Sequence, residues 1–289
     1  MDTFSILPQY KNCYFCNDLL AQSQLLKNTN NFLCEVCNQV TKWNHLTILE
    51  SSKISITKIE KLLTLFLDNK TASEANNVLK YSFINEGLNI KTVYRYYEIF
   101  NLIVHDFVER KMQSIIFDGE VEIDETYLVK EKKTKAPRRA YKNSSQWLFG
   151  IRKRGTTDFF IAPIENKDAG TILPLIFRHI KINSKIYSDS YSVYVNNRTI
   201  PKNSHLKQYG YIHYFVNHKI EFVSALLETI HTNTIESLWK EIKTYLRKSR
   251  NTNKFLFSIY RYYFTKKLTK KMQIEILLQN LQKENFIQF

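Results

Sequence analysis

Apolar and acidic residues alternate along residues 119–129, GEVEIDETYLV. Val121 and Ile123 lie on one side of an extended chain with this pattern. Glu122 and Asp124 lie on the other side. A period of two predicts a half-buried β-strand. The pattern leaves two interpretations of Asp124 open: an exposed acid on a sheet face, or a carboxylate with a chemical role.

A second strand is predicted over residues 185–188, and it ends at Asp189. The β-type letters KIYS stop there and give way to a turn or a helix. Functional residues of α/β sheets gather at such strand ends, although an Asp in this place is also a common helix N-cap. Asp189 is therefore ambiguous by itself.

Residues 231–250 have the apolar spacing of an amphipathic helix. Its apolar stripe consists of Ile235, Leu238, Trp239, Ile242 and Leu246. Glu236, Lys240 and Lys243 lie together on another face. Glu236 has two structural explanations, a capping box with Asn233 and an ion pair with Lys240. A role in chemistry is the third.

Three helices are predicted between residues 54 and 111. A capping box at Thr71 and Glu74 opens the second, and Asn89 is placed to cap the third. Three helices with short polar turns suit a helix-turn-helix, in which the third helix enters a DNA groove. The residues near its N-terminal end that would face DNA are Lys91, Thr92, Tyr94 and Arg95. A plain helical packing domain has the same periodicity and stays open.

Two further strands are predicted over residues 147–154 and 159–164, and Asp168 opens a helix after them. Pro174 is expected in the first turn or at a boundary of that helix, where proline is tolerated. Residues 211–215 form a fifth expected strand. The sequence therefore predicts an α/β domain.

The 289-residue chain carries 42 Lys and Arg against 27 Asp and Glu, a net charge of +15. Such a balance favours a polyanionic partner, either nucleic acid or an anionic membrane surface. No apolar run approaches the about 18 residues of a membrane span, and the chain shows no signal-peptide pattern. We therefore expect a soluble intracellular protein that binds nucleic acid and no membrane.

Ten Lys or Arg residues and one acid lie between residues 130 and 154. We expect a loop there that binds phosphate, while a solvated loop and a nuclear localisation signal remain alternatives. Its proposed DNA contacts are Lys132, Lys133, Arg138 and Arg139. Residues 240–271 carry eleven more basic residues interleaved with aromatic ones, which suits a surface that follows a DNA strand and begins with Lys240 and Lys243.

The four cysteines form two C-x₂-C pairs separated by 17 residues, Cys13 with Cys16 and Cys34 with Cys37. This spacing is typical of a zinc ribbon in which four thiolates hold one structural Zn²⁺. Two disulfides are the alternative, which an intracellular location disfavours. The chain has no Gly-rich phosphate loop and no G-x-S-x-G elbow, so kinase, NTPase and hydrolase classes are unsupported.

Five phrases of the sequence resemble, in the family's order, those of the DDE transposases. The resemblance is closest to the Merlin superfamily and the related bacterial insertion-sequence enzymes, and it extends over residues 119–250. The phrases are VEIDET at 121–126, QWLFGI at 146–151, YSDSY at 187–191, GYIHYFVNH at 210–218 and HTNTIESLWK at 231–240. The family often has a glycine shortly after the first acid, where this chain has Leu128, Val129 and Lys130.

The resemblance implies an α/β fold with an RNase H-like catalytic core, a mixed five-stranded sheet with flanking helices. In that core Asp124, Asp189 and Glu236 would be the catalytic triad that binds Mg²⁺ or Mn²⁺, two ions per active site. His218, His231 and Asn233 are expected as auxiliary residues beside the metals. A zinc ribbon often precedes this core and serves DNA or protein contacts.

We therefore expect four domains: a zinc ribbon at 1–50, a helix-turn-helix-like DNA-binding domain at 51–116, the DDE core at 117–250 and a basic helical tail at 251–289. The expected function is a DNA transposase that binds double-stranded terminal inverted repeats, cleaves DNA and transfers 3′ ends to target DNA. A homodimer or higher oligomer on DNA is expected. The expected location is the nucleus in a eukaryotic host, and otherwise the cytoplasm or nucleoid. A non-catalytic DNA-binding protein and a structure-specific RNase H-like nuclease are the alternatives.

Overall fold

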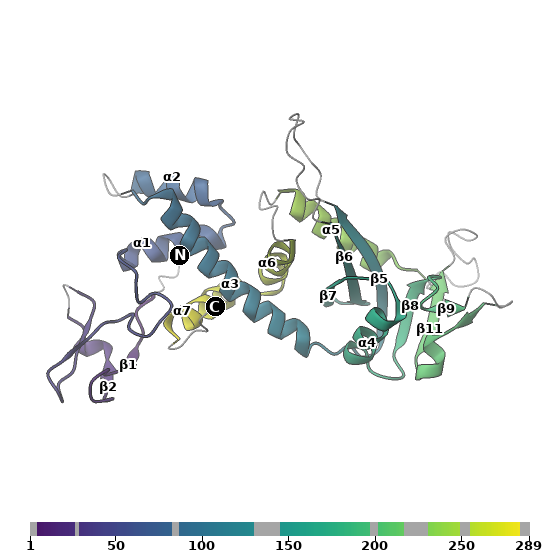
Figure 1. The fold of residues 1–289 in the computed structure, drawn as a ribbon, viewed down its shortest axis with the longest axis horizontal. Coiled ribbons are helices and arrows are strands. Elements are labelled where there is room, and N and C mark those ends of the chain that lie inside the picture. The colour runs from purple at the N-terminus through teal and green to yellow at the C-terminus, as the bar shows by residue number, and fades with distance from the viewer. Residues whose placement is uncertain are drawn as a thin grey trace. The chain divides into compact units, whose positions relative to one another are not determined.

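The computed structural model describes residues 5–26, 29–82, 87–129, 145–196, 202–216, 231–248 and 255–283 (Figure 1). The chain divides into two compact units. The first consists of Met1–Phe107 and Tyr263–Phe289, and the second is Val108–Tyr262. The boundaries fall inside two helices, α3 (Ile90–Ser114) and α6 (Phe255–Lys267). The expected four-domain division stays a prediction.

Two small hairpins form the cysteine-rich start of the first unit. The first pairs β1 (Tyr10–Asn12) with β2 (Leu19–Ala21), and the second pairs β3 (Phe32–Leu33) with β4 (Val40–Thr41). A 3₁₀ turn, η1 (Gln22–Gln24), follows β2. Each C-x₂-C pair is followed by an asparagine with positive φ, Asn17 at 63° and Asn38 at 55°. These left-handed residues close the two matching cysteine turns, a conformation that asparagine tolerates better than most residues.

The first unit includes helices α1 (Ile56–Leu67) and α2 (Ala72–Ser82) and α3 up to Phe107. The predicted capping box is confirmed, because the Thr71 N–H donates to Glu74 Oε2 over 2.7 Å and the Glu74 N–H donates to Thr71 Oγ1 over 3.2 Å. Asn89 caps α3 as predicted, with its Oδ1 accepting from the Lys91 N–H at 2.9 Å.

The C-terminal helix α7 (Lys270–Gln282) belongs to the first unit, far from its position in the sequence. Lys270 Nζ lies 2.7 Å from Asp68 Oδ1 at the end of α1. The Gln282 side-chain amide donates to the Ile6 carbonyl over 2.8 Å. These contacts join α7 to the end of α1 and to Ile6 within one unit.

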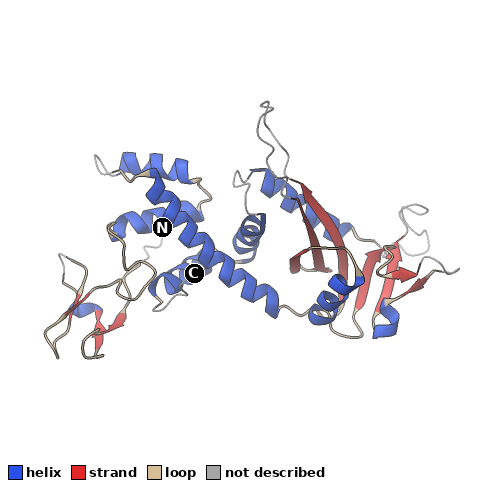
Figure 2. Ribbon diagram, in the orientation of Figure 1, coloured by secondary structure: helices blue, strands red, loops and turns tan. Residues whose placement is uncertain are grey.

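Within the described part of the second unit, five strands form one mixed sheet in the order β11-β8-β5-β6-β7. These strands are labelled in Figure 1 and drawn in red in Figure 2. The strands are β5 (Glu120–Val129), β6 (Ser145–Lys153), β7 (Phe159–Ile164), β8 (Lys185–Asp189) and β11 (Ile212–Val216). Strands β5, β6 and β7 are antiparallel neighbours, whereas β8 is parallel to both β5 and β11. The predicted α/β fold with a mixed five-stranded sheet and flanking helices is confirmed. A two-stranded pair, β9 (Val195–Asn196) with β10 (Asn203–Ser204), and the 3₁₀ turn η2 (Leu206–Tyr209) lie between β8 and β11.

Helices cover both faces of this sheet. Helix α4 (Ala169–His179) covers the face of Phe160, on which the His179 ring stacks at 3.9 Å between centroids. Helix α5 (Asn233–Lys248) packs on β5 and β6, and Trp239 places it on the opposite face, over Gly150. The prediction that the 119–129 strand is half buried is therefore wrong. Its strand β5 is central, and Glu122 on it is fully buried.

The expected position of Pro174 is also wrong, because it lies inside α4, in its second turn. Proline there removes one helix hydrogen bond. The helix is retained because the Asp168 carboxylate caps its start, accepting from the Thr171 N–H at 2.8 Å, and because Ile172 and Ile176 are buried.

Among the described helices, none combines the length and the apolar character that a membrane span requires.

Candidate active site

Asp124 and Asp189 are at equivalent places on neighbouring parallel strands. The β5–β8 pairing ends with Glu122 opposite Tyr187. Asp124 and Asp189 each lie two residues beyond that last pair, where the strands separate. The carboxyl ends of parallel strands are where functional side chains of open α/β sheets converge. The structure thus brings together two of the three predicted catalytic acids.

The indole of Trp239 links helix α5 to Asp124. Its Nε1–H donates to Asp124 Oδ2 over 2.9 Å. The ring passes over Gly150, the residue that pairs with Asp124 on the adjacent strand β6. A Cβ at Gly150 would lie 2.6 Å from two ring carbons of Trp239, closer than real Cβ atoms come. Glycine is therefore required where the indole crosses the sheet.

The buried carboxylate of Glu122 fixes the start of α5. Its Oε2 accepts from the backbone N–H of Ile235 over 2.9 Å, so a residue of the central strand satisfies a donor in the first turn of the helix. Its Oε1 is paired with Arg154 Nε, also over 2.9 Å. Arg154 in turn donates to the His231 carbonyl and lies over the Tyr187 ring. An acid at the N-terminal end of a helix is also favoured by the helix dipole.

Glu236, the third predicted acid, lies in the first turn of α5 and is exposed. Its Oε1 accepts a hydrogen bond from the Thr232 hydroxyl over 2.9 Å. Residues three apart on a helix are neighbours, so Glu236 lies next to Trp239 along the helix surface. The link from Trp239 to Asp124 therefore sets the position of Glu236 relative to the strand acids.

Carboxylates crowd around Asp124. Burial, followed by the negative charges of Glu125 and Asp189, raises the pKa of Asp124 to about 7. Burial also raises the pKa of Glu125, although Tyr194 donates to this carboxylate and Lys167 Nζ lies 3.0 Å from it. Such repulsion disfavours the ionised acids unless a cation is present.

The three predicted acids do not form a tight cluster. Among the described residues, one group of three or more His, Cys, Asp or Glu side chains has all its ligand atoms within 4.8 Å of one another, and it consists of the four cysteines. The three acids do not meet this criterion. Acids that bind two ions about 3.5–4 Å apart need not be that close to one another. Asp124 and Asp189 therefore lie near each other at the ends of their strands. Glu236 is linked to Asp124 indirectly, through Trp239 of the same helix α5.

The other predicted residues are distributed as follows. His231 lies beside Glu122, with its Nδ1 3.5 Å from Oε1, and Asn233 begins α5. His218 lies outside the described residues, as do Lys132, Lys133, Arg138 and Arg139. Lys91, Tyr94, Arg95 and Lys240 are exposed, whereas Thr92 and Lys243 are half-buried. The Arg95 guanidinium donates to the Ser51 hydroxyl over 3.3 Å.

Sequence reasoning assigned no role to Glu122, Gly150 or the indole N–H of Trp239. Signals existed for two of them. A glycine inside a predicted strand marks a close approach of another group, and an acid inside an apolar strand needs a partner. Trp239 gave no such signal, because its place on the apolar stripe already explains it.

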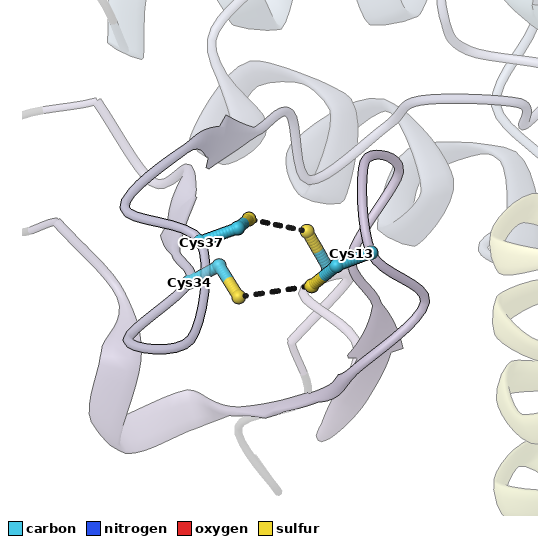
Figure 3. Close-up of side chains that lie close together, drawn as sticks. Cys13, Cys34 and Cys37 are labelled. Carbon is cyan, nitrogen blue, oxygen red and sulfur yellow. Dashed lines mark hydrogen bonds between the residues drawn. The ribbon is translucent and has the colours of Figure 1, made fainter.

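The four cysteines converge between the two hairpins of the first unit (Figure 3). The Sγ atoms of Cys13 and Cys37 are 3.6 Å apart, and those of Cys16 and Cys34 are 3.5 Å apart. Both distances exclude a disulfide, whose sulfurs are about 2.0 Å apart. They are close to the about 3.8 Å edge of a tetrahedron with metal–sulfur bonds of about 2.3 Å.

The surroundings of Cys13 favour its thiolate form, whereas burial raises the pKa of Cys37 in the same cluster. Burial opposes the ionisation of Cys13, but the hydrogen bonds from the Cys16 and Phe15 backbone and from the Thr41 hydroxyl lower the pKa of Cys13 to about 6. Thiolate, not thiol, is the metal ligand. The donor set and its spacing fit one tetrahedral zinc ion.

Residues 116–254, just under half of the chain, match the sequence model of the ISXO2-like transposase domain. The predicted resemblance to DDE transposases is thereby confirmed for this stretch. No curated protein matches the chain.

Solved structures with weak similarity include a chain of the simian T-cell lymphotropic virus intasome in complex with PP2A regulatory subunit B56 gamma. That match has 12% identity and a TM-score of 0.29, and covers 58% of this chain and 49% of that chain, about half its length. The Mos1 mariner paired-end complex with Mn matches at 9% identity and a TM-score of 0.25, covering 78% of this chain and 97% of that one. The pre-cleavage Mos1 transpososome matches at 8% identity and a TM-score of 0.22, with the same coverage.

Proposed function

We propose that this chain, whose residues 116–254 match the sequence model of the ISXO2-like transposase domain, is a metal-dependent DNA transposase that cleaves DNA and transfers 3′ ends to target DNA. One observation carries the proposal. Asp124 and Asp189 leave neighbouring parallel strands at the same level, and Trp239 connects Asp124 to the helix that bears Glu236. Such a site suits phosphodiester chemistry, which needs several carboxylates at one point.

Asp124, Asp189 and Glu236 would hold the divalent ions, Mg²⁺ or Mn²⁺. Oxygen donors alone are what these hard cations prefer, and the mutual repulsion that raises the pKa of Asp124 is what a cation would relieve. When bound, two such ions activate an attacking oxygen and stabilise the leaving oxygen at phosphorus. Asp124 Oδ2 accepts from the Trp239 indole N–H, which would orient this carboxylate toward the ions.

The second unit would supply most of the electrostatic attraction to DNA. Residues 108–262 contain 27 Lys and Arg against 15 Asp and Glu, a net charge of +12. Residues 1–107 contain ten of each and are neutral. Because phosphate contacts by Lys and Arg dominate affinity for DNA, the transposase domain is the part expected to bind its backbone.

The first unit would contribute a structural Zn²⁺ and sequence recognition. The four thiol sulfurs lie at tetrahedral spacing. Lys91, Tyr94 and Arg95 are exposed near the start of α3, where a recognition helix contacts base edges. We propose that they contact the terminal inverted repeats. The neutrality of residues 1–107 fits a role in selectivity better than one in overall affinity.

The test is an incubation of the purified chain with labelled DNA that carries the terminal repeats flanking its own gene, in Mg²⁺ or Mn²⁺. Wild type should nick these ends and join them to target DNA, and Glu236→Gln should abolish both steps while retaining DNA binding. Glu165→Gln is the matched control, since Glu165 is an exposed acid of the same unit outside the site. Salt-sensitive binding without cleavage by wild type would refute catalysis and favour the non-catalytic DNA-binding protein. Cleavage without joining would favour the nuclease.

A further inference from the structure

The cysteine-rich hairpins expose more large apolar side chains than their size accounts for. Of sixteen exposed large hydrophobic residues in the described chain, seven lie before residue 50. They are Tyr10, Tyr14, Phe15, Leu19, Val36, Val40 and Leu46. This part already has its own core, in which Leu20 and Phe32 are fully buried beside the cysteines. The exposed residues are therefore not needed to hold the hairpins together.

Tyr14, Phe15 and Leu46 form one surface, here called the knuckle patch. They line the same hollow beside Cys13 and Cys16. The Tyr14 ring meets the Phe15 ring edge-on at 5.2 Å between centroids and the His45 ring at 4.2 Å. Exposure is 59% for Tyr14, 57% for Phe15 and 41% for Leu46. Contiguous exposed apolar surface of this kind marks an interaction site.

Leu46 is held in a backbone conformation that leucine disfavours. Its φ is 59°, in the left-handed region. Of the six described non-glycine residues with positive φ, the other five are asparagine, the residue that tolerates this region. The strain at Leu46 is of order 1–2 kcal/mol. A strained leucine that is also exposed points to a use for its side chain, since asparagine would suit the backbone better.

The charge around the patch excludes a phosphate backbone as its main partner. Residues 1–50 contain three lysines against four acids. One of these lysines, Lys11, is only 6% exposed, and its ammonium donates to the His45 carbonyl over 2.8 Å. Backbone binding to DNA needs clustered cations, which this surface lacks. The surface that docks on the patch is therefore apolar and nearly uncharged, as the patch itself is.

We infer that the knuckle patch is a self-association surface, on which a second copy of this chain docks patch to patch. Two copies that each carry a net charge of +15 repel one another, most strongly between their basic units. The nearly neutral hairpins are the surface where that repulsion is weakest. An apolar patch that pairs with itself also meets the requirement of a two-fold symmetric contact. This inference goes beyond the proposed function and does not depend on it.

The experiment measures the mass of the full zinc-loaded chain by sedimentation equilibrium without DNA, at low and at high salt. Wild type should form a dimer that tightens as salt rises, because salt screens the charge repulsion while the apolar contact persists. Tyr14→Ser with Phe15→Ser should weaken the dimer by at least about tenfold. Tyr81→Ser, which removes an 87% exposed aromatic outside the hairpins, is the matched control and should leave it unchanged.

Leu46→Asn separates association from folding. Asparagine relieves the positive-φ strain, so the thermal midpoint should stay the same or rise, while the dimer weakens as in the aromatic variant. A wild type that stays monomeric at high salt would overturn the inference. So would dimerisation that is unchanged in both variants. The inference would also be overturned if the Tyr14→Ser, Phe15→Ser variant still dimerised but lost binding to single-stranded DNA. That result would assign the Tyr14 and Phe15 rings to base stacking.

Discussion

Trp239 donates its indole N–H to the carboxylate of Asp124 over 2.9 Å, although the two residues are 115 positions apart in the chain. The bond joins the central strand of the sheet to the helix that carries Glu236. One carboxylate oxygen of Asp124 is thereby fixed, and α5 is held over the strand end. The geometry of the proposed active site therefore depends on a residue that is not itself an acid.

Trp239→Phe tests this bond. Phenylalanine retains an aromatic ring over Gly150 but has no N–H, so Asp124 loses its fixed orientation. Single-turnover DNA cleavage should fall by about 10–100-fold, the equivalent of a hydrogen bond to a charged group, and more Mg²⁺ should be needed for half-maximal rate. DNA affinity should not change. Trp43→Phe, in the first unit, is the control, and an equal loss there would mean that the assay responds to general destabilisation.

Gly150→Ala tests the same contact from the other side. The added Cβ would lie 2.6 Å from the Trp239 ring, so the indole must move and its bond to Asp124 must weaken. We expect a loss of about 1–3 kcal/mol in the free energy of unfolding, measured in urea, together with slower cleavage. Gly170→Ala is the matched control, because the nearest atom that its Cβ would meet is a carboxylate oxygen of Asp168 at 3.6 Å, an ordinary contact distance. A stable, fully active Gly150→Ala protein would contradict the assigned packing.

The raised pKa of Asp124 predicts how stability depends on pH in metal-free protein. The folded pKa is about 7, against an ordinary value of 3.8, so the folded state binds the proton more tightly than the unfolded state. The stabilisation from protonated Asp124 is complete below about pH 4 and is lost as pH rises through 7. Asp124→Asn removes this dependence.

At pH 8 without metal, Asp124→Asn should therefore unfold at a higher temperature than wild type by several degrees, corresponding to about 1–3 kcal/mol. Differential scanning calorimetry at pH 4 and pH 8 gives the comparison. Mg²⁺ at pH 8 should stabilise wild type and have no effect on the variant. A wild type that gains stability relative to the variant between pH 4 and pH 8 would show that the sign is wrong.

Glu122→Gln should destabilise the second unit. The substitution keeps the side-chain shape but removes the charge that pairs with Arg154 and that lies at the N-terminal end of α5. Breaking a buried pair from one side costs about 3–5 kcal/mol, which urea unfolding would measure. Glu120→Gln on the same strand is the control. In the ion pair of Glu120 with Lys185, the Lys185 side chain is 45% exposed and the Glu120 side chain 42%. The loss in the free energy of unfolding should therefore be below about 1 kcal/mol.

Removal of zinc should unfold the cysteine hairpins and leave the second unit folded. The hairpin core is small and includes Cys13 and Cys34 themselves, so it depends on the metal. Chelation, or Cys34→Ser, should release one zinc per chain and abolish protection of the hairpin amides from hydrogen exchange. Protection of β5 and β8 should persist. Hairpins that remain protected after chelation would argue against a structural zinc.

The sequence by itself determined the main elements of the sheet domain and the positions of the candidate acids and cysteines. The alternation around Asp124, the strand that ends at Asp189 and the two C-x₂-C pairs are local patterns, and local patterns follow from backbone geometry and ligand spacing. Motif order supplied the resemblance to a transposase domain. Each of these is readable from neighbours within a few residues.

Only the tertiary structure decided which face of each element is buried and which distant groups meet. The period of two at 119–129 predicted a strand with one solvent-exposed face. Strand β5 is instead central and covered by helices on both sides, so Glu122 is buried and paired with Arg154. The bond from Trp239 to Asp124, the glycine that makes room for it and the return of α7 to the first unit are contacts between residues far apart in the chain. Local spacing carries no information on such contacts, because they are selected by the packing of the whole domain.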